Sequence, residues 1–269
     1  MTSTTKIEIL QSGIWQLNSV IISRSGECII IDPGYFPREL EDLVNLAKML
    51  GSTKNVIFTH GHWDHIVGWS HFPMATVLGS NSLKNAIDSG STAAQENLKC
   101  AQEFDSRWYV ERQTSLKWPE IKSLSEGDLL EVGKTHIHVL ETPGHSLDGL
   151  ALFLKEEDVL LAGDYLSPLE IPFIDDLQSY RNTLLRFIDL LSDVKKIIPG
   201  HGPVLTSKQA REIALADLKY LDELETCVTS NDATSAVRIS LPRAENVVGM
   251  RNFHLENCKK VGLSIISTT

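Results

Sequence analysis

The chain has 269 residues, of which 42% are hydrophobic and 22% charged, which is typical of a globular protein with one large domain or two small ones. No apolar run reaches the roughly 18 residues that a membrane-spanning helix requires, and a formal charge of −10 argues against a broad nucleic-acid-binding surface. The four cysteines lack C-x-x-C spacing and the first residues lack a secretory pattern, so we expect reduced thiols in a cytoplasmic protein.

The first part of the chain predicts strands followed by a helix. Apolar runs and alternation between residues 6 and 31 predict three or four antiparallel strands, and Asp32 ends the last of them abruptly. Pro37 then opens a helix that keeps apolar residues on one face as far as Leu50. The apolar run at 55–58 predicts a buried strand.

Residues 91–120 are predicted to form a helical insertion, because apolar side chains recur there at helical spacing. The insertion is dense in aromatic residues, namely Phe104, Trp108, Tyr109 and Trp118. It forms local core for its helix, a lid over a site, or a subunit contact in a homodimer, and the sequence leaves these alternatives open.

The second half predicts strands at 135–140, 150–154 and 158–163, a helix near 177–191, and a strand at 196–199. Each half therefore contains the same order of features: an apolar strand, an aspartate, a helix, an apolar strand and a histidine. Two sheets packed face to face, each with helices outside, would bring both sets of strand ends to one edge. Binding sites form where loops at such edges converge.

The tail is predicted to be a helical extension of a single domain. We place the core at about 1–205 and the extension at about 206–269. Thr206 with Gln209 forms a plausible capping box for a long helix that ends near residue 226. A last helix is predicted at roughly 243–262.

The strongest chemical signal is the run HGHWDH at residues 60–65, which follows the strand at 55–58. His60 and His62 are two residues apart, so they point the same way on an extended backbone. Asp64 continues this alternation and His65 points in another direction. One short stretch can therefore offer two imidazoles to one metal ion, and a carboxylate with an imidazole to a second.

Three further ligand candidates each follow an apolar strand and lie beside a glycine: His145, Asp164 and His201. The resulting five imidazoles and two carboxylates suit zinc or another borderline divalent ion, and suit calcium or magnesium poorly. Seven side chains are too many for one tetrahedral ion, but they fit two ions that share one carboxylate and keep open positions for water. Gly61, between two ligands, is expected to provide a positive φ and close packing around the site.

These residues carry a family resemblance. The pattern His-x-His-x-Asp-His, followed by Pro-Gly-His, Gly-Asp and Gly-His-Gly, resembles the metallo-β-lactamase superfamily over about residues 1–205. The resemblance implies an α+β fold, an αββα sandwich of two mixed β-sheets with outer helices. It also implies a ligand assignment: His60, His62 and His145 on the first ion, Asp64, His65 and His201 on the second, and Asp164 bridging both.

Asp32 matches the first motif of that family, which implies that it supports the ligands without binding metal. Its role would be to hold a histidine in one tautomer and one orientation. The residues alone also allow a helix cap or a turn at this position.

The metal set predicts a hydrolase. Two ions about 3.5–4 Å apart lower the pKa of a shared water to near 7 and hold hydroxide as a nucleophile. Asp64 is the natural proton acceptor. We therefore predict hydrolysis of an ester-like bond, in a thioester, lactone or ester, by a dinuclear enzyme with zinc as the first choice and iron or manganese as options. The bridging Asp164 and the helical tail resemble glyoxalase II-like and lactonase-like proteins, whereas no clear basic cluster for glutathione carboxylates is visible.

The substrate pocket is predicted from aromatic residues near strand ends. Trp63, Tyr165 and Phe173 would form an apolar wall suited to an acyl chain or an aromatic group, with rim packing as the alternative. His254 in the last helix should face inward, as a packed histidine or as a substrate contact. The expected partner is a small-molecule substrate, with no membrane, with nucleic acid disfavoured, and with a homodimer left open.

Three rival functions remain at this point. A phosphodiesterase or ribonuclease of the same fold would need a basic groove, which the acidic balance disfavours. An iron-dependent oxidoreductase similar to persulfide dioxygenases would use the same motifs. A non-catalytic scaffold would not need all seven ligands.

Overall fold

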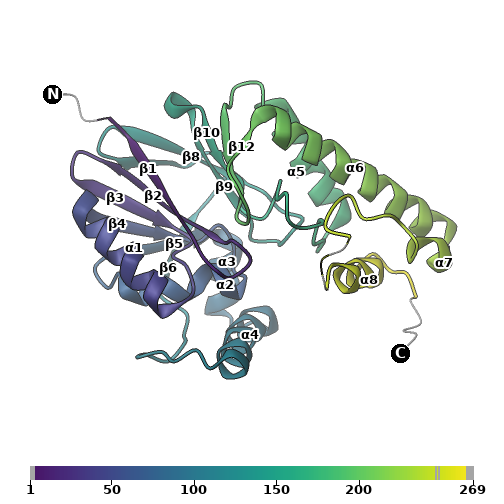
Figure 1. Cartoon of the computed structure of the whole chain (residues 1–269), viewed down its shortest axis with the longest axis horizontal. Helices are drawn as coiled ribbons and strands as arrows, with labels where there is room; N and C mark the ends of the chain where they lie inside the picture. The colour runs from purple at the N-terminus through teal and green to yellow at the C-terminus, as the bar shows by residue number, and fades with distance from the viewer. Residues whose placement is uncertain (1–3, 246, 248, 265–269) are drawn as a thin grey trace.

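The computed structural model describes residues 4–245, 247 and 249–264. Two six-stranded β-sheets pack face to face and carry helices on their outer faces (Figure 1). The strand orders are β1-β2-β3-β4-β5-β6 in the first sheet and β12-β11-β10-β9-β8-β7 in the second. The predicted αββα sandwich is therefore confirmed.

The first sheet begins antiparallel and continues parallel from β3 onward. Its strands are β1 (Lys6–Gln11), β2 (Asn18–Arg24), β3 (Glu27–Ile31), β4 (Ser52–Ile57), β5 (Thr76–Ser80) and β6 (Ile121–Leu124). Three strands occupy residues 6–31, because the apolar run at 14–17 forms a tight turn instead of a fourth. Trp15 and Gln16 take positive φ angles of 48° and 55° in that turn.

The second sheet is antiparallel except for one parallel pair, β10 and β11. Its strands are β7 (Leu129–Val132), β8 (Thr135–Glu141), β9 (Leu150–Leu154), β10 (Val159–Leu161), β11 (Lys196–Ile198) and β12 (Leu205–Thr206). Parallel neighbours need a crossover connection, and a helix supplies it in both sheets. The units β3-α1-β4 and β10-α5-β11, with α1 at Pro37–Leu50 and α5 at Leu177–Leu190, are the repeated pattern that the sequence predicted.

Apolar side chains hold the sandwich together in three layers: one between the sheets and one on the outer face of each sheet. Side chains such as Ile22, Ile29 and Leu152 fill the space between the sheets. α1 buries Leu40 and Leu43 against the outer face of the first sheet, as its helical apolar spacing requires. Each such fully buried side chain stabilises the fold by about 1.5–3 kcal/mol relative to exposure.

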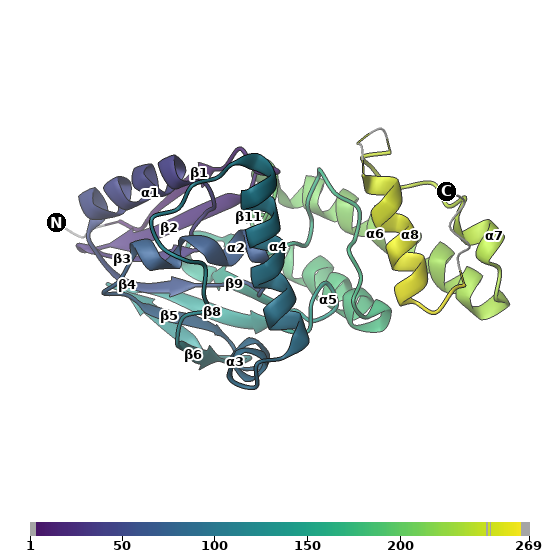
Figure 2. The ribbon, with the colours of Figure 1, turned by 90° about the horizontal axis from the view of Figure 1, so that it is seen from below.

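Of the remaining helices, α6 (Ser207–Ser230) begins on the outer face of the second sheet, and the others lie at the edges of the sandwich and beyond it. The others are α2 (Trp63–Ile66), η1 (Val67–His71), α3 (Asn81–Asp88), α4 (Thr92–Trp108), η2 (Lys155–Glu157), α7 (Ala233–Ala236) and α8 (Met250–Lys260). Figure 2 shows α6, α7 and α8 gathered at the end of the molecule opposite the N-terminus. Among the described residues, no helix is both long enough and apolar enough to cross a bilayer.

Two predicted helices are shorter than the sequence suggested. The helix of the insertion 91–120 ends at Trp108, because Tyr109 adopts a left-handed conformation with φ of 55°, and the chain then runs irregularly to β6. The last helix begins at Met250 and not near residue 243, since Gly249 with φ of 100° caps its start. The capping box of α6 is confirmed, with Thr206 and Gln209 bonded reciprocally.

Candidate metal centre

All seven predicted metal ligands lie at one edge of the sandwich, at the ends of strands. The segment that holds His60 and His62 follows β4, and α2 presents Asp64 and His65 in its single turn. The other three ligands come from the second sheet and follow β8, β10 and β11: His145, Asp164 and His201.

The edge is closed by contacts between the two sheets. The backbone N–H of Asn18, at the start of β2, donates to the Gly200 carbonyl at 2.7 Å, and Leu17 forms an isolated β-bridge with His201. The Asn18 amide also donates to the carbonyls of Pro199 and Gly202, both at 2.8 Å. The loop that carries His201 is therefore held by the first sheet as well as by its own.

Three imidazoles form the first ligand group. Nδ1 of His62 lies 2.9 Å from Nε2 of His60 and 3.0 Å from Nε2 of His145. These nitrogen atoms and an Asp164 oxygen all lie within 4.8 Å of one another. Nitrogen lone pairs at such short mutual distances repel each other unless a proton or a cation lies among them.

The second group contains Asp64, His65 and His201, whose ligand atoms also lie within 4.8 Å of one another. Oδ2 of Asp64 is 3.3 Å from Nε2 of His201 and 3.7 Å from Nε2 of His65. All three side chains are buried.

The Asp164 carboxylate connects the two groups. Its Oδ2 is 3.5 Å from Nε2 of both His60 and His145, and 3.6 Å from Nε2 of His201, while its Oδ1 is 3.3 Å from Nε2 of His65. One carboxylate thus lies between two histidines of the first group and two of the second. This position is what a ligand shared by two ions requires.

In four of the five histidines, Nδ1, the ring nitrogen that points away from the centre, donates a hydrogen bond to an acceptor, which fixes the tautomer. Nδ1 of His145 donates to the Phe173 carbonyl at 3.2 Å, and Nδ1 of His201 donates to the Trp15 carbonyl at 3.1 Å. Nδ1 of His65 donates to Asp32 at 2.9 Å. With the proton on Nδ1, each Nε2 carries a lone pair that faces the centre.

Asp32 organises this side of the centre. Its carboxylate accepts hydrogen bonds from the Thr59 N–H at 2.8 Å, the Thr59 hydroxyl at 2.7 Å and the His65 ring. Because that hydroxyl donates to Asp32, it accepts from Nδ1 of His60, 3.1 Å away, which is the fourth fixed tautomer. Asp32 therefore lies where the supporting role implied by the resemblance would place it.

The donor set fits two cations. Nε2 of His65 and Oδ1 of Asp164 are buried and have no hydrogen-bond partner among the described residues, and both face the centre. Burial opposes protonation of His65, but the surrounding carboxylates, Asp164 foremost, raise its pKa well above the usual value. Burial and the nearby His60 lower the pKa of His62 to about 4. The carboxylates around His65 therefore favour positive charge there, whereas burial also lowers the pKa of His145 in the first group well below its usual value.

Glu170 is an eighth ligand-type residue that the sequence did not reveal. Its carboxylate lies within 4.8 Å of ligand atoms of Asp164 and His201, on the side of the second group. Burial raises its pKa to about 7, against the opposing effect of His201. It lies in the long connection between β10 and α5, where no periodic pattern marks a functional position.

Gly61 is needed for space and not for a positive φ, which corrects the prediction. It is not among the residues with positive φ. A Cβ atom at this position would lie 2.6 Å from the side chain of Leu83 and 2.7 Å from that of Asp148. Asp148 also accepts a hydrogen bond from the Gly61 N–H at 2.9 Å, which fixes the backbone between two ligands.

A pocket of about 240 Å³ opens onto the centre. Two of the predicted pocket residues, Trp63 and Phe173, line it together with Trp15, which lies in the apolar run that left a fourth strand open. The turn at Trp15 aims its carbonyl at His201 and its ring at the pocket. The other lining residues are His62, Asp64, Asp164, Glu170, His201, Phe253, Glu256, Asn257 and Lys260.

Tyr165 and His254 do not line this pocket, and packing is the alternative that the structure shows for both. Tyr165 turns away from it, packs on Tyr180 at 4.5 Å between ring centres, and donates its hydroxyl to the Pro143 carbonyl at 2.8 Å. That hydroxyl accepts from the His145 N–H at 3.0 Å, so Tyr165 positions a ligand loop. His254 is fully buried beneath α8, bonded to the Tyr220 hydroxyl and the Ala236 carbonyl, both at 2.9 Å.

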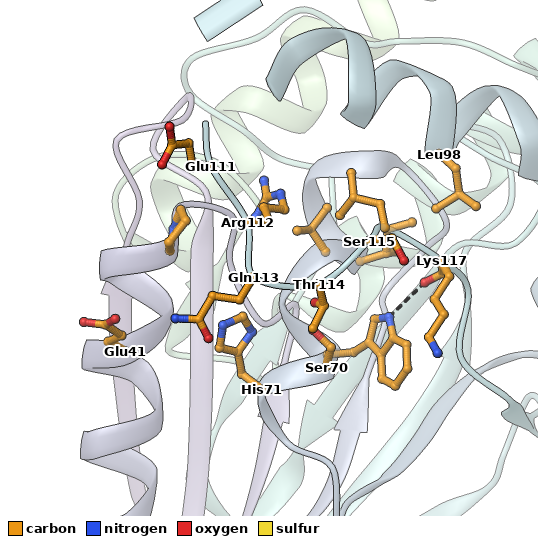
Figure 3. Close-up of a pocket in the computed structure, with 15 residues that line it drawn as sticks. Glu41, Ser70, His71, Leu98, Glu111, Arg112, Gln113, Thr114, Ser115 and Lys117 are labelled. Carbon is orange, nitrogen blue, oxygen red and sulfur yellow. Dashed lines mark hydrogen bonds between the residues drawn. The ribbon is translucent and has the colours of Figure 1, made fainter. Parts of the chain in front are cut away.

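A second cavity, of about 520 Å³, lies between α1, η1 and the irregular segment after α4 (Figure 3). Its lining includes Glu41, His71 and Arg112, and the Trp69 ring N–H donates to the Lys117 carbonyl at 3.1 Å. None of the seven predicted ligands is among the described residues that line it. The seven predicted ligands converge elsewhere, so the candidate functional site is the pocket at the strand ends.

Comparison with known proteins agrees with this geometry. The sequence profile of the "Metallo-beta-lactamase superfamily" matches residues 12–201. The chain is 25% identical to the "Beta-lactamase-like protein 2 homolog" of Caenorhabditis elegans, covering 88% of this chain and 76% of that protein. It is 22% identical to the "Acyl-coenzyme A thioesterase MBLAC2" of Gallus gallus, covering 87% and 88%. The crystal structure of a metallo-beta-lactamase family protein from Thermus thermophilus superposes with a TM-score of 0.66 at 20% identity, covering 96% and 94%. The chain therefore belongs to the metallo-β-lactamase superfamily.

Proposed function

We propose that this protein is a dinuclear metal-dependent hydrolase of an ester-like bond, with a thioester as the first choice of substrate. The observation that carries the proposal is the position of Asp164, whose carboxylate lies within 3.3–3.6 Å of imidazole nitrogens from both ligand groups. A shared carboxylate of this kind suits two ions in one centre.

The ligand assignment follows the two groups. His60, His62 and His145 would hold the first ion, and Asp64, His65 and His201 the second, with Asp164 common to both. When bound, two divalent ions would supply Lewis acidity toward the substrate oxygen and a water molecule acidic enough to react near neutral pH.

The protein's own groups orient the ligands and handle the proton. The acceptors on Nδ1 of His65, His145 and His201 keep each Nε2 lone pair directed at the centre. Both Asp64 and Asp164 line the pocket, but Asp164 is engaged with both ligand groups. Asp64 is therefore the carboxylate to which we assign proton transfer during hydrolysis.

The pocket favours a substrate with an apolar part and a polar part. Trp15, Trp63 and Phe173 form an apolar wall beside the ligands, whereas Glu256 and Lys260 lie on the α8 side. The name of the chicken relative, an acyl-coenzyme A thioesterase, supports a thioester as substrate. A small molecule that joins an acyl group to a polar thiol would meet both kinds of surface.

Zinc is the metal that we propose first, because imidazoles dominate the donor set. Iron and manganese remain compatible with five imidazoles and several carboxylates. Elemental analysis of the purified protein, combined with oxygen uptake, separates the hydrolase from an iron-dependent oxidoreductase.

The test is turnover of thioesters, lactones and phosphodiesters by protein of known metal content. His62→Ala should lose the first ion and reduce kcat/KM for the best ester at least ~100-fold. His136→Ala is the matched control, because the side chain of that histidine is 40% exposed on β8, 3.5–3.6 Å from the surface glutamates Glu156 and Glu131. Full turnover by His62→Ala with unchanged metal content would contradict the assignment, and preferred cleavage of phosphodiesters would replace the proposed substrate class.

A further inference from the structure

We propose that the groove between α4 and the aromatic residues beside the metal centre binds an extended apolar acyl chain, with the scissile carbonyl at the metal pocket. This inference rests on the proposed hydrolysis of ester-like bonds and names the part of the substrate that gives specificity. The groove has a volume of about 650 Å³, within the range of about 300–1,000 Å³ found for small-molecule sites.

The groove adjoins the metal pocket. Trp15 and Trp63 line both, and Trp63 lies between the ligands His62 and Asp64 in the chain. Figure 1 shows α4 below α2, the helix that carries Trp63, and the two helices are in contact. A substrate with its scissile carbonyl in the metal pocket can therefore extend its chain over these two tryptophans into the groove.

Aromatic rings form the wall. The Trp63 ring lies 5.4 Å from that of Trp15 and 5.0 Å from that of Phe104 on α4, measured between ring centres. Trp108 continues the row, 6.3 Å from Phe104, and Phe36, 6.2 Å from Phe104, also lines the groove. Trp15 and Trp108 are 51% and 60% exposed, so large apolar area remains available to a ligand.

The wall is held in place from beneath. Tyr35 is fully buried and contacts the rings of Trp63 and Phe104 at 5.1 and 5.2 Å. Its hydroxyl donates to Asp105 at 2.7 Å, and the Arg112 guanidinium lies 4.4 Å from the ring centre. A preorganised apolar wall of this kind binds a ligand without the loss of side-chain freedom that a mobile surface would incur.

Apolar lining orients the substrate. The charged residues that line the groove are Glu103 and Arg107, which are of opposite sign and lie one helical turn apart on α4. The α8 side of the metal pocket has a similar pair, Glu256 and Lys260, so the difference between the two regions is the row of aromatic rings in the groove. The apolar chain therefore belongs in the groove, and the polar leaving group on the side of α8.

The test is a series of straight-chain acyl thioesters from two to twelve carbons on one thiol. Each methylene that enters the groove should raise kcat/KM by about fourfold, which corresponds to about 0.8 kcal/mol, until the groove is filled. Cys100→Trp places a bulky ring in the groove from an exposed position on α4, and should lower the ratio of kcat/KM for the ten-carbon over the two-carbon substrate at least tenfold. Trp108→Ala should lower the same ratio several-fold.

Lys99→Trp is the matched control, since it adds the same ring at the neighbouring, 60% exposed position outside the groove and should leave the ratio unchanged. An unchanged ratio in both Cys100→Trp and Trp108→Ala would overturn the inference. A kcat/KM for a benzoyl thioester that is higher than for every straight-chain thioester would also overturn it. A dimer that these variants dissociate, with the chain-length ratio unaltered, would identify the groove as an interface between two copies.

A binding measurement separates this inference from the proposed function. Straight-chain carboxylic acids, the products of hydrolysis, should bind the wild type with a Kd that falls as the chain lengthens, read from tryptophan fluorescence. Cys100→Trp should abolish that dependence, as measured by calorimetry. If Kd falls with chain length but no thioester is hydrolysed, the proposed function is refuted and chain binding in the groove is supported. If thioesters are hydrolysed but Kd does not depend on chain length, only chain binding in the groove is refuted.

Discussion

Replacing Asn257 on α8 should weaken metal binding at the opposite wall of the pocket. This side chain is buried and bridges α8 to the connection between β10 and α5. Its Oδ1 accepts from the Ile174 N–H at 3.0 Å, and its Nδ2 donates to the Pro172 carbonyl at 2.6 Å and to the Tyr220 hydroxyl at 3.1 Å. The residue between, Phe173, supplies the carbonyl that accepts from Nδ1 of His145.

The expected magnitude follows from these bonds. Asn257→Leu leaves the Ile174 N–H and the Pro172 carbonyl buried without their partner, each at a cost of about 1–3 kcal/mol. We therefore expect the free energy of unfolding to fall by about 2–6 kcal/mol. The displaced Phe173 carbonyl would no longer hold the His145 tautomer, and loss of such a partner typically lowers metal affinity by about 10–100-fold.

The assay is competition with a chromogenic chelator, which gives both metal dissociation constants, together with urea unfolding of the metal-free protein. Asn252→Leu is the control, because that asparagine is exposed on the same helix. If Asn257→Leu loses stability but keeps its affinity for the first ion within twofold of the wild type, α8 does not support the centre in this way.

Three further outcomes are expected. Glu170→Gln should weaken binding of the second ion about tenfold or more, measured as metal per protein after dialysis and by calorimetry, and two retained equivalents with unchanged affinity would show that the carboxylate is not a ligand. The Arg243 guanidinium donates to the Asp217 carboxylate at 2.6 and 2.9 Å, and Asp217→Asn would remove its counter-charge. Urea unfolding at pH 7 should therefore show a free energy of unfolding lower by about 3 kcal/mol. Arg186→Gln, in an exposed pair with Glu126, is the control and should lower it by at most about 1 kcal/mol. Burial lowers the pKa of His254, so the unfolded chain takes up a proton that the folded protein refuses, and stability should fall as the pH drops below about 6.5. His254→Gln should reduce the slope of unfolding free energy against pH between about 7 and 5, and an unchanged slope would mean that the folded protein accommodates the charge.

The sheets and the convergence of ligands could be predicted because both depend on local patterns. Apolar strands that end in Asp32, Asp164 or His201 recur in both halves, and the carboxyl ends of parallel strands share an edge. The direction of the Tyr165 side chain could not be predicted in the same way. Tyr165 follows Asp164 in a turn between positive-φ residues, Gly163 and Leu166, where strand alternation does not apply, and its ring packs on Tyr180.

Other features depend on tertiary contacts that no pattern records. Glu170 reaches the centre from an irregular connection, and its burial depends on packing between elements far apart in the chain. Trp15 lies in a turn with positive φ at a non-glycine residue, which an apolar run conceals. His254 faces inward as its helical spacing predicts, but the interior that it meets is Tyr220 on α6 and not the pocket.

Four of the ligands come from the side of the first sheet and three from the second sheet, so bound ions would cross-link the two sheets. Ligands that bind only the folded state stabilise it in proportion to the logarithm of their concentration. The lifetime of this protein against proteases would then follow the supply of its metal, even in variants that have lost all turnover.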